Sequence, residues 1–392
     1  MSARTRPTAG LPLTVIAGLF LASLAMRPQI LAIGPLLPLI RTDLGLSASL
    51  AGLLTAVPVL CMGLFAPFGP RLAAYLGPRR AFAACVGWLV CLGVVRSVVP
   101  GFTAVLLATF GIGVGIGIAG PIPSMIVSTR VATRPALGTG AYAGGIVAGS
   151  TLAAALAVPL AFGGQWRSSL LIISVTSLVS LVAWLVLVRG DGGVIRGLRA
   201  PTIPWGNRTG WLLMVVFGLQ SILYYGVVAW LPNAFVERGW NAADAGSLVA
   251  LCNGVGLLTT IGVPLVADRY GSRRSQLTVA SIVATLTLVA IIAVPAFAYG
   301  WVAVLGLALG AVFPLVLTLP IDVTTDPRQV GSIAALMLLG GYIISATGPF
   351  ALGAARDLTG DFATSLWMLV GVGVVLVGCC LLLSPARLAR RP

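Results

Sequence analysis

Apolar residues follow one another in twelve long runs, and short polar or glycine-rich breaks separate these runs. A helix needs roughly 20 consecutive apolar residues to cross the hydrocarbon core of a bilayer. We therefore expect an all-α membrane protein with twelve transmembrane helices. The break between the ninth and tenth runs, from Pro295 to Gly300, is the least distinct. The predicted spans are 12–40, 49–69, 80–99, 102–128, 136–162, 168–188, 208–235, 244–267, 276–296, 298–322, 329–355 and 363–384.

Composition indicates that lipid is the solvent for most of the chain. Of its 392 residues, 58% are hydrophobic and 8% are charged, whereas soluble domains carry roughly 25% charged residues. The chain has no Lys and no His, so it lacks the usual proton shuttle, the commonest metal ligand and any Ser-His or Cys-His pair. We expect neither an enzyme nor a metal or other cofactor. The six cysteines lie within apolar runs without metal-ligand spacing, and we interpret them as packing residues.

The basic residues predict the orientation of the chain. A net charge of +15 could indicate a nucleic-acid partner, but the 24 arginines lie in short islands between apolar runs, so we expect none. With twelve spans both termini share one side of the membrane, and that side receives 18 of the 24 arginines. Positive charge favours the cytoplasmic side. We expect a multi-pass protein of the bacterial cytoplasmic (inner) membrane with both termini cytoplasmic, bound to lipid and monomeric.

The chain contains an internal repeat. The segment Pro70–Arg80 resembles Pro264–Arg274 at an offset of 194 residues, and Ile30–Gly34 resembles Ile222–Gly226 at an offset of 192. Parallel repeats of six spans place a substrate site near mid-membrane, between two halves related by a pseudo-two-fold axis. The predicted divisions are an N-terminal half at 1–190, a cytoplasmic linker at 191–207 and a C-terminal half at 208–392.

The segment Asp268–Arg274 resembles the signature loop of the major facilitator superfamily, Gly-x-x-x-Asp-Arg-x-Gly-Arg-Arg. It departs from that pattern at Pro264 and Ser272, and its first-half copy has Ala74 in place of the Asp. A glycine permits the tight turn. The Asp can pair with arginines at a helix end and so form a contact that opens when the halves rotate. The candidate gating residues are Asp268, Arg269, Gly271, Arg273, Arg274, Gly77, Arg79 and Arg80.

A closer resemblance covers nearly the whole chain. The segments Arg27–Pro38, Gly218–Pro232, Gly306–Leu319 and Gly341–Gly360 resemble the cyanate and 2-nitroimidazole transporter branch of that superfamily. This resemblance implies the major facilitator fold and secondary transport of a small molecule by alternating access. Members of the branch often carry a Gln where this chain has Leu338-Leu339-Gly340, and a polar residue in the fourth span where it has Gly120-Pro121. These departures favour a different substrate.

Arg27 is the leading candidate for substrate binding. It lies close to the centre of the first run, where a charge is costly and usually faces the protein interior for a functional reason. No Asp or Glu lies at comparable depth, so Arg27 reads as the only fixed charge near mid-membrane. We expect it to bind an anionic or strongly dipolar solute. The alternative is that Arg27 caps carbonyls freed where Pro28 breaks the helix.

Polar residues within other spans are the further candidates. Gln220 and Tyr224 share a helix face, being four residues apart, and we expect that Tyr224 and Tyr225 do not both face the site squarely. For each candidate the alternative is hydrogen bonding or packing between helices. Trp230 is predicted to lie in the interfacial belt. The candidate substrate-binding residues besides Arg27 are Gln29, Gln220, Tyr224, Tyr225, Tyr142, Asn253, Tyr342 and Ser124.

Coupling and direction stay open. Asp322 is the only acid near a span interior, and it is the candidate proton carrier; facilitated diffusion and exchange are the alternatives. An efflux carrier for drugs or metabolites with the same fold is the second hypothesis, although an uncompensated Arg disfavours lipophilic cations. A membrane sensor that does not transport is the third.

Overall fold

The computed structural model describes residues 13–131, 135–189, 204–267, 273–324 and 326–383. Within these ranges every regular element is a helix, and twelve segments are long and apolar enough to cross a membrane. Their ends agree with the predicted spans to within six residues. The indistinct ninth-to-tenth boundary is a true break, because α13 ends at Ala293 and the short 3-10 helix η2 precedes α14.

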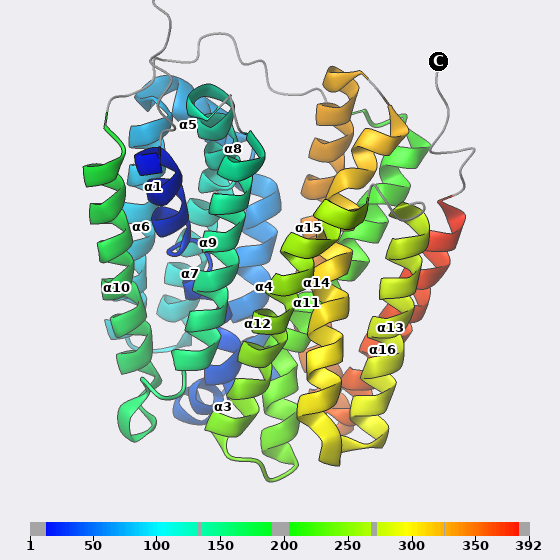
Figure 1. Cartoon of the computed structure of the whole chain (residues 1–392). Coiled ribbons are helices and arrows are strands. Elements are labelled where there is room, and N and C mark those ends of the chain that lie inside the picture. Colours follow the sequence, from blue (N-terminus) through cyan, green and yellow to red (C-terminus); the bar gives the residue numbers. More distant parts are fainter. Residues whose placement is uncertain (1–12, 132–134, 190–203, 268–272, 325, 384–392) are drawn as a thin grey trace, which may run out of the picture.

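The first six spans form one half of the molecule, on the left of Figure 1. Its elements are α1 (Leu13–Ser23), α2 (Pro28–Leu31), α3 (Ile33–Leu44), α4 (Ala48–Phe65), α5 (Phe68–Leu76), α6 (Pro78–Val98), α7 (Phe102–Ala119), α8 (Ile122–Arg130), α9 (Pro135–Leu156), η1 (Phe162–Gly164) and α10 (Trp166–Leu187).

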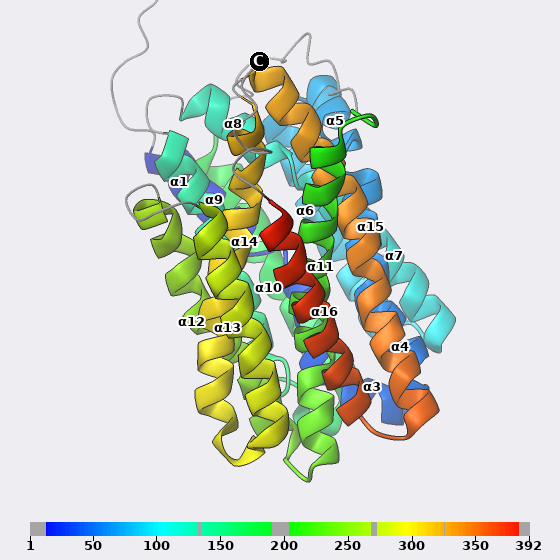
Figure 2. The same ribbon diagram turned by 90° about the vertical axis from the view of Figure 1, so that its right-hand side faces the viewer.

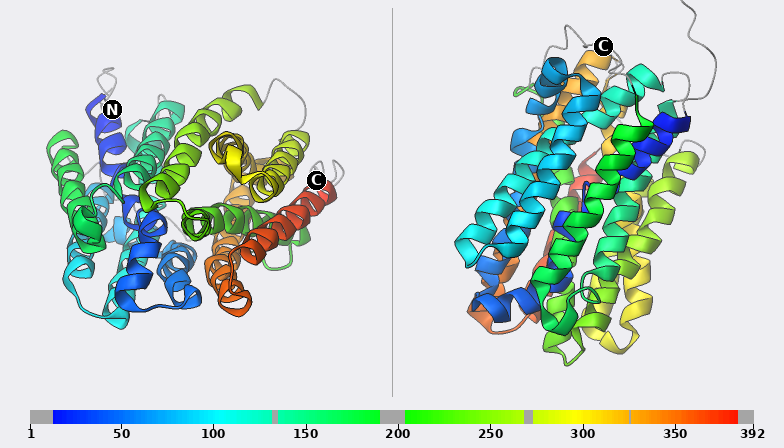
Figure 3. Two further views of the ribbon diagram at one scale, coloured as in Figure 1. Left: turned by 90° about the horizontal axis from the view of Figure 1, so that it is seen from below. Right: turned by 90° about the vertical axis from the view of Figure 1, so that its left-hand side faces the viewer.

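The last six spans form the other half, and the view along the bundle in Figure 3 shows the two halves side by side. Its elements are α11 (Arg208–Glu237), α12 (Ala242–Ala267), α13 (Arg273–Ala293), η2 (Pro295–Phe297), α14 (Ala298–Val323), α15 (Pro327–Thr359) and α16 (Ala363–Leu382). Most of the predicted linker lies outside the described residues, so the exact limits of the halves remain predictions.

Prolines interrupt two spans of the first half. The first span stops being helical after Ser23 and resumes at Pro28, which has no N–H to donate to the preceding turn. In that gap the amides of Ala25 and Met26 reach back only three residues, to Ala22 and Ser23. The fourth span breaks in the same way at Pro121, between α7 and α8. Non-helical backbone at membrane depth is tolerated where protein buries it or it borders a cavity.

The two halves touch most closely at the end of the bundle where α3 ends, which we call the lower end; α5 and α8 mark the upper end (Figure 1). Helices α4 and α15 lie side by side along their length (Figure 2). A Cβ at Gly52 would lie 2.5 Å from the carbonyl oxygen of Pro349, and one at Gly34 would overlap that of Val228. Glycine is therefore required where the halves meet.

One carboxylate joins the halves at the lower end. Asp357, at the end of α15, accepts hydrogen bonds from the backbone amides of Ala48 (2.8 Å) and Ser49 (2.7 Å). These amides belong to the first turn of α4, where a helix has unpaired N–H groups and favours negative charge. The second half thus caps a helix of the first half.

Candidate functional site

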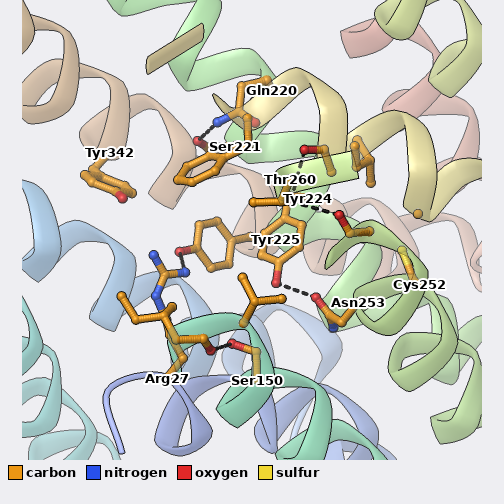
Figure 4. Close-up of a pocket in the computed structure, with 17 residues that line it drawn as sticks. Arg27, Ser150, Gln220, Ser221, Tyr224, Tyr225, Cys252, Asn253, Thr260 and Tyr342 are labelled. Carbon is orange, nitrogen blue, oxygen red and sulfur yellow. Dashed lines mark hydrogen bonds between the residues drawn. The ribbon is translucent and has the colours of Figure 1, made fainter. Parts of the chain in front are cut away.

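A cavity lies between the halves and is bordered by the break in the first span and by α9, α11, α12, α14 and α15. The empty space inside it is about 730 Å³, including its open mouth. The apolar lining includes Ile146 and Val147 of α9 and Leu309 and Phe313 of α14. The polar residues of the lining are labelled in Figure 4: Arg27, Ser150, Gln220, Ser221, Tyr224, Tyr225, Asn253, Thr260 and Tyr342.

Arg27 is the one charged side chain among the described residues that line this cavity. Its Nη1 donates a 2.8 Å hydrogen bond to the hydroxyl of Tyr225 (Figure 4). The guanidinium comes from the first half and the tyrosine from the second, so the bond crosses the cavity. The partner is neutral, and the charge of Arg27 therefore remains available to a ligand.

A second arginine, Arg96, contacts the backbone just after the break in the first span. Arg96 is completely buried, and its Nη1 donates to the carbonyl oxygen of Gln29 (3.0 Å) while its Nη2 donates to Gln29 Oε1 (2.8 Å). The expectation that Arg27 is the only fixed charge near mid-membrane was wrong. Arg96 reads in the sequence as a charge at the end of the third span, but its long side chain turns inward to residue 29.

Both tyrosines of α11 line the cavity, and they point to different partners. Their rings meet edge to face, with centroids 5.2 Å apart, which lets one reach Arg27 and the other reach α12. Tyr224 donates a 2.7 Å hydrogen bond to Asn253 Oδ1. Gln220 donates to Ser221 (2.6 Å) and keeps its carbonyl oxygen for other partners.

Tyr342 completes the set of predicted residues that the structure brings together. It lies on α15, lines the cavity, and packs edge to face against Phe217 with ring centroids 5.0 Å apart. Six predicted residues therefore share this cavity: Arg27, Gln220, Tyr224, Tyr225, Asn253 and Tyr342.

Three predicted residues lie elsewhere. Gln29 is completely buried against Arg96 and Ser174 and is absent from the cavity lining. Ser124 and Tyr142 hydrogen-bond to each other (3.2 Å) between α8 and α9, also outside the lining. Trp230 is not an interfacial residue, because it is completely buried and donates to the carbonyl of Pro349.

The arginines of the repeated loop contact helix ends within their own halves. Arg79 donates to the carbonyls of Leu185 (2.9 Å) and Val188 at the end of α10. Arg274 donates to those of Cys380 (3.3 Å) and Leu381 (2.6 Å) at the end of α16. Cations favour the carbonyl-rich end of a helix, so each half carries an equivalent contact.

The remaining gating candidates are partly described. Gly77 has φ +82°, the turn conformation expected for a glycine, and Arg80 lies in the first turn of α6. Arg273 pairs with Asp322 at 2.9 Å. Asp268, Arg269 and Gly271 lie outside the described residues.

Ser150, Ser221 and Thr260 also line the cavity, and the sequence did not single them out. Hydroxyl residues are common within spans because they can bond to their own helix. Ser150 does so with Ile146 O (2.8 Å) and Thr260 with Gly256 O (2.9 Å). The one sequence feature that could have indicated any of them is the position of Ser221 next to Gln220.

Two six-helix halves around a central cavity define the class of secondary transporters that work by alternating access. Residues 15–349 match the Major Facilitator Superfamily, and the chain belongs to this family. Its matched relatives are transporters rather than enzymes.

Two relatives from Escherichia coli (strain K12) extend over most of the chain. The cyanate transport protein CynX is 30% identical over 352 residues, which are 88% of this chain and 90% of that protein. The 2-nitroimidazole transporter is 27% identical over 369 residues, which are 93% and 92% of the two chains. Among solved structures, a bacterial homologue of the lysosomal transporter Spinster, inward-facing and unoccupied, matches with a TM-score of 0.78, 15% identity and coverage of 97% and 98%. The last likeness concerns the fold alone.

Proposed function

We propose that this transporter moves a small anionic or strongly dipolar solute across a bacterial cytoplasmic membrane, as a monomer, and that Arg27 binds the solute. The supporting observation is the pairing of Arg27 with a neutral hydroxyl in the cavity between the halves. A guanidinium in a poorly solvated site is stabilised most by an anion that accepts its N–H groups. Gln220, Tyr224, Tyr225, Asn253 and Tyr342 supply further hydrogen-bonding groups to the same space.

The proposed orientation follows from the arginine distribution, which favours a cytoplasmic upper end. Because Asp357 and the glycine contacts close the lower end, we interpret this conformation as inward-facing. Transport then requires the lower contacts to separate while the upper end closes. The ion pair of Asp322 with Arg273 favours a structural role for that carboxylate over proton transfer.

Ligand-dependent stability and transport test the role of Arg27. We expect cyanate, nitrate, formate or 2-nitroimidazole to raise the unfolding temperature of the detergent-purified protein, since a ligand that binds only the folded state stabilises it. In proteoliposomes, Arg27→Gln should lower the uptake of the stabilising solute roughly 10- to 100-fold, because hydrogen bonds to a charged group contribute about 1.5–3 kcal/mol.

Arg71→Gln is the matched control, since Arg71 is an exposed arginine of α5 outside the cavity. It should leave both the ligand shift and uptake as in the wild type. Equal stabilisation and equal uptake by the Arg27→Gln protein would show that this guanidinium does not bind the solute. If no anion or nitro compound produces a shift that depends on Arg27, the proposed solute class is wrong.

The apolar part of the cavity lining supports the second hypothesis, an efflux carrier for drugs or metabolites. Ile146, Val147, Leu309 and Phe313 offer a surface that suits an amphipathic compound. Because the cavity carries a positive charge, we expect overproduction of the protein not to protect cells against cationic dyes. Such protection would favour the efflux carrier.

A further inference from the structure

We propose that Arg96 is a positioning residue for the transport site: it holds the broken middle of the first span so that Arg27 faces Tyr225 and the cavity. The functional meaning of this role rests on the proposed binding of solute by Arg27. The structural part can be tested without any solute.

Arg96 makes a bidentate contact with a single residue. Its two terminal nitrogens bind the main-chain and side-chain oxygens of Gln29, at 3.0 and 2.8 Å. Gln29 Nε2 then donates to Ser174 Oγ (3.1 Å), which itself donates to Leu170 O (2.6 Å). The third, first and sixth spans are thereby tied together through residue 29, and all three linked side chains are completely buried.

The contact lies where the first span has least structure of its own. Helical hydrogen bonding lapses between Ser23 and Pro28, and Arg27 sits at the end of that gap with φ −114° and ψ −20°. The direction of Arg27 therefore depends on what fixes the residues that follow it. Gln29 is two residues away, and Arg96 and Ser174 fix both its backbone and its amide.

The close packing of α6 against Gln29 depends on a glycine at position 93. Gly93 precedes Arg96 by three residues, on the same face of α6. A Cβ at position 93 would collide with Ser174 Oγ and would lie 2.8 Å from Gln29 Nε2. The third span can approach the break this closely only with glycine there.

A neutral side chain at position 96 would not make the same pair of hydrogen bonds to Gln29. Only a guanidinium offers two parallel N–H donors in a rigid fork, which matches the paired oxygens of Gln29. Both acceptors are neutral, and Nε of Arg96 has no hydrogen-bond partner among the described residues. A buried cation without a counter-charge is unfavourable for stability alone, and intramembrane charges generally mark functional regions.

A double-mutant cycle on the thermal unfolding of the detergent-purified protein tests this role. Tyr225→Phe removes the hydroxyl that binds Arg27 and should lower the unfolding midpoint by roughly 2–4 °C. In the Arg96→Gln background the same substitution should have little further effect, because Arg27 no longer faces residue 225. Tyr224→Phe is the matched control: it removes a hydroxyl that binds Asn253, and its effect should add to that of Arg96→Gln.

Two further variants keep the test decisive if Arg96→Gln does not fold. Arg96→Lys keeps the charge but not the fork, and Gln29→Leu keeps the backbone acceptor but not the amide. Both should reduce the effect of Tyr225→Phe. An undiminished Tyr225→Phe shift in these backgrounds would overturn the positioning role. Since no solute is used, that result is separate from a failure of Arg27→Gln to alter transport, which would overturn the proposed function.

Discussion

Removing the Asp357 carboxylate should open the lower end of the molecule. Asp357 bridges the halves through the amides of Ala48 and Ser49. Hydrogen bonds to a charged group contribute about 1.5–3 kcal/mol when buried. Asp357 is exposed, and we therefore take about 1 kcal/mol for each bond after solvent screening. Asp357→Ala loses about 2 kcal/mol of closure, which raises the ratio of open to closed lower ends about 30-fold.

Spin labels at Phe162 and Phe297 report this change. Both side chains are more than half exposed, at 63% and 61%, and they lie in lower-end connections of opposite halves. Replacing the exposed Cys91 and the partly exposed Cys379 with Ser leaves the engineered cysteines as the accessible labelling sites, because the other four cysteines are buried. Double electron–electron resonance should show one short distance in the parent protein and a second, longer distance after Asp357→Ala. Asp357→Asn, which retains one acceptor oxygen, should give a smaller rise of about 5-fold.

Asp361→Asn is the matched control. It removes the same charge four residues away, but Asp361 accepts its hydrogen bond from Thr364 within its own half. If Asp361→Asn lengthens the distance as much as Asp357→Ala, net charge rather than the capping contact sets closure. A distance distribution that Asp357→Ala leaves unchanged in folded protein would refute the reasoning altogether.

Three further outcomes follow from the contacts described above. Gly93→Ala should destabilise the protein by about 1–3 kcal/mol through overpacking, measured by thermal unfolding. Gly371→Ala should have almost no effect, since the added Cβ would meet no described atom within 4 Å beyond the adjacent backbone of its own helix. Equal effects would contradict the crowding at Gly93. Arg79→Ala and Arg274→Ala should each lower stability by about 1–2 kcal/mol with unchanged solute affinity in a binding titration. Arg27→Lys should retain about a tenth of the wild-type affinity, because an ammonium lacks the guanidinium fork; full affinity would mean that charge alone suffices.

Hydropathy was sufficient to predict the spans because crossing a bilayer requires a long apolar run whatever the helix packs against. The repeat then placed Arg27 opposite the stretch from Gln220 to Tyr225, and the structure brings these residues into one cavity. The depth of Arg27 in its span and its position opposite the second-half stretch were enough to predict this part of the site.

Hydropathy and the repeat could not predict the direction in which individual side chains point. Lipid and protein interior are equally apolar, so a span has no polar face that marks which side is buried against protein. Arg96 lies near a span end and could equally reach outward to the interface; only packing against Gln29 shows that it turns inward. Trp230 was misjudged for the same reason, since its indole packs beneath Phe362, with ring centroids 5.2 Å apart, instead of facing headgroups.

The contact between α4 and α15 also links the lower end mechanically to the cavity. Gly353 and Gly52 bring the helices together near the lower end, and further along the same contact a Cβ at Gly63 would lie 3.0 Å from Cβ of Tyr342. Tyr342 lines the cavity. A sliding of the whole of α15 against α4 that separates Asp357 from its amides would shift Tyr342 as well. The proposed solute site and the distant lower end are thus connected through a single helix, with Pro349 between them.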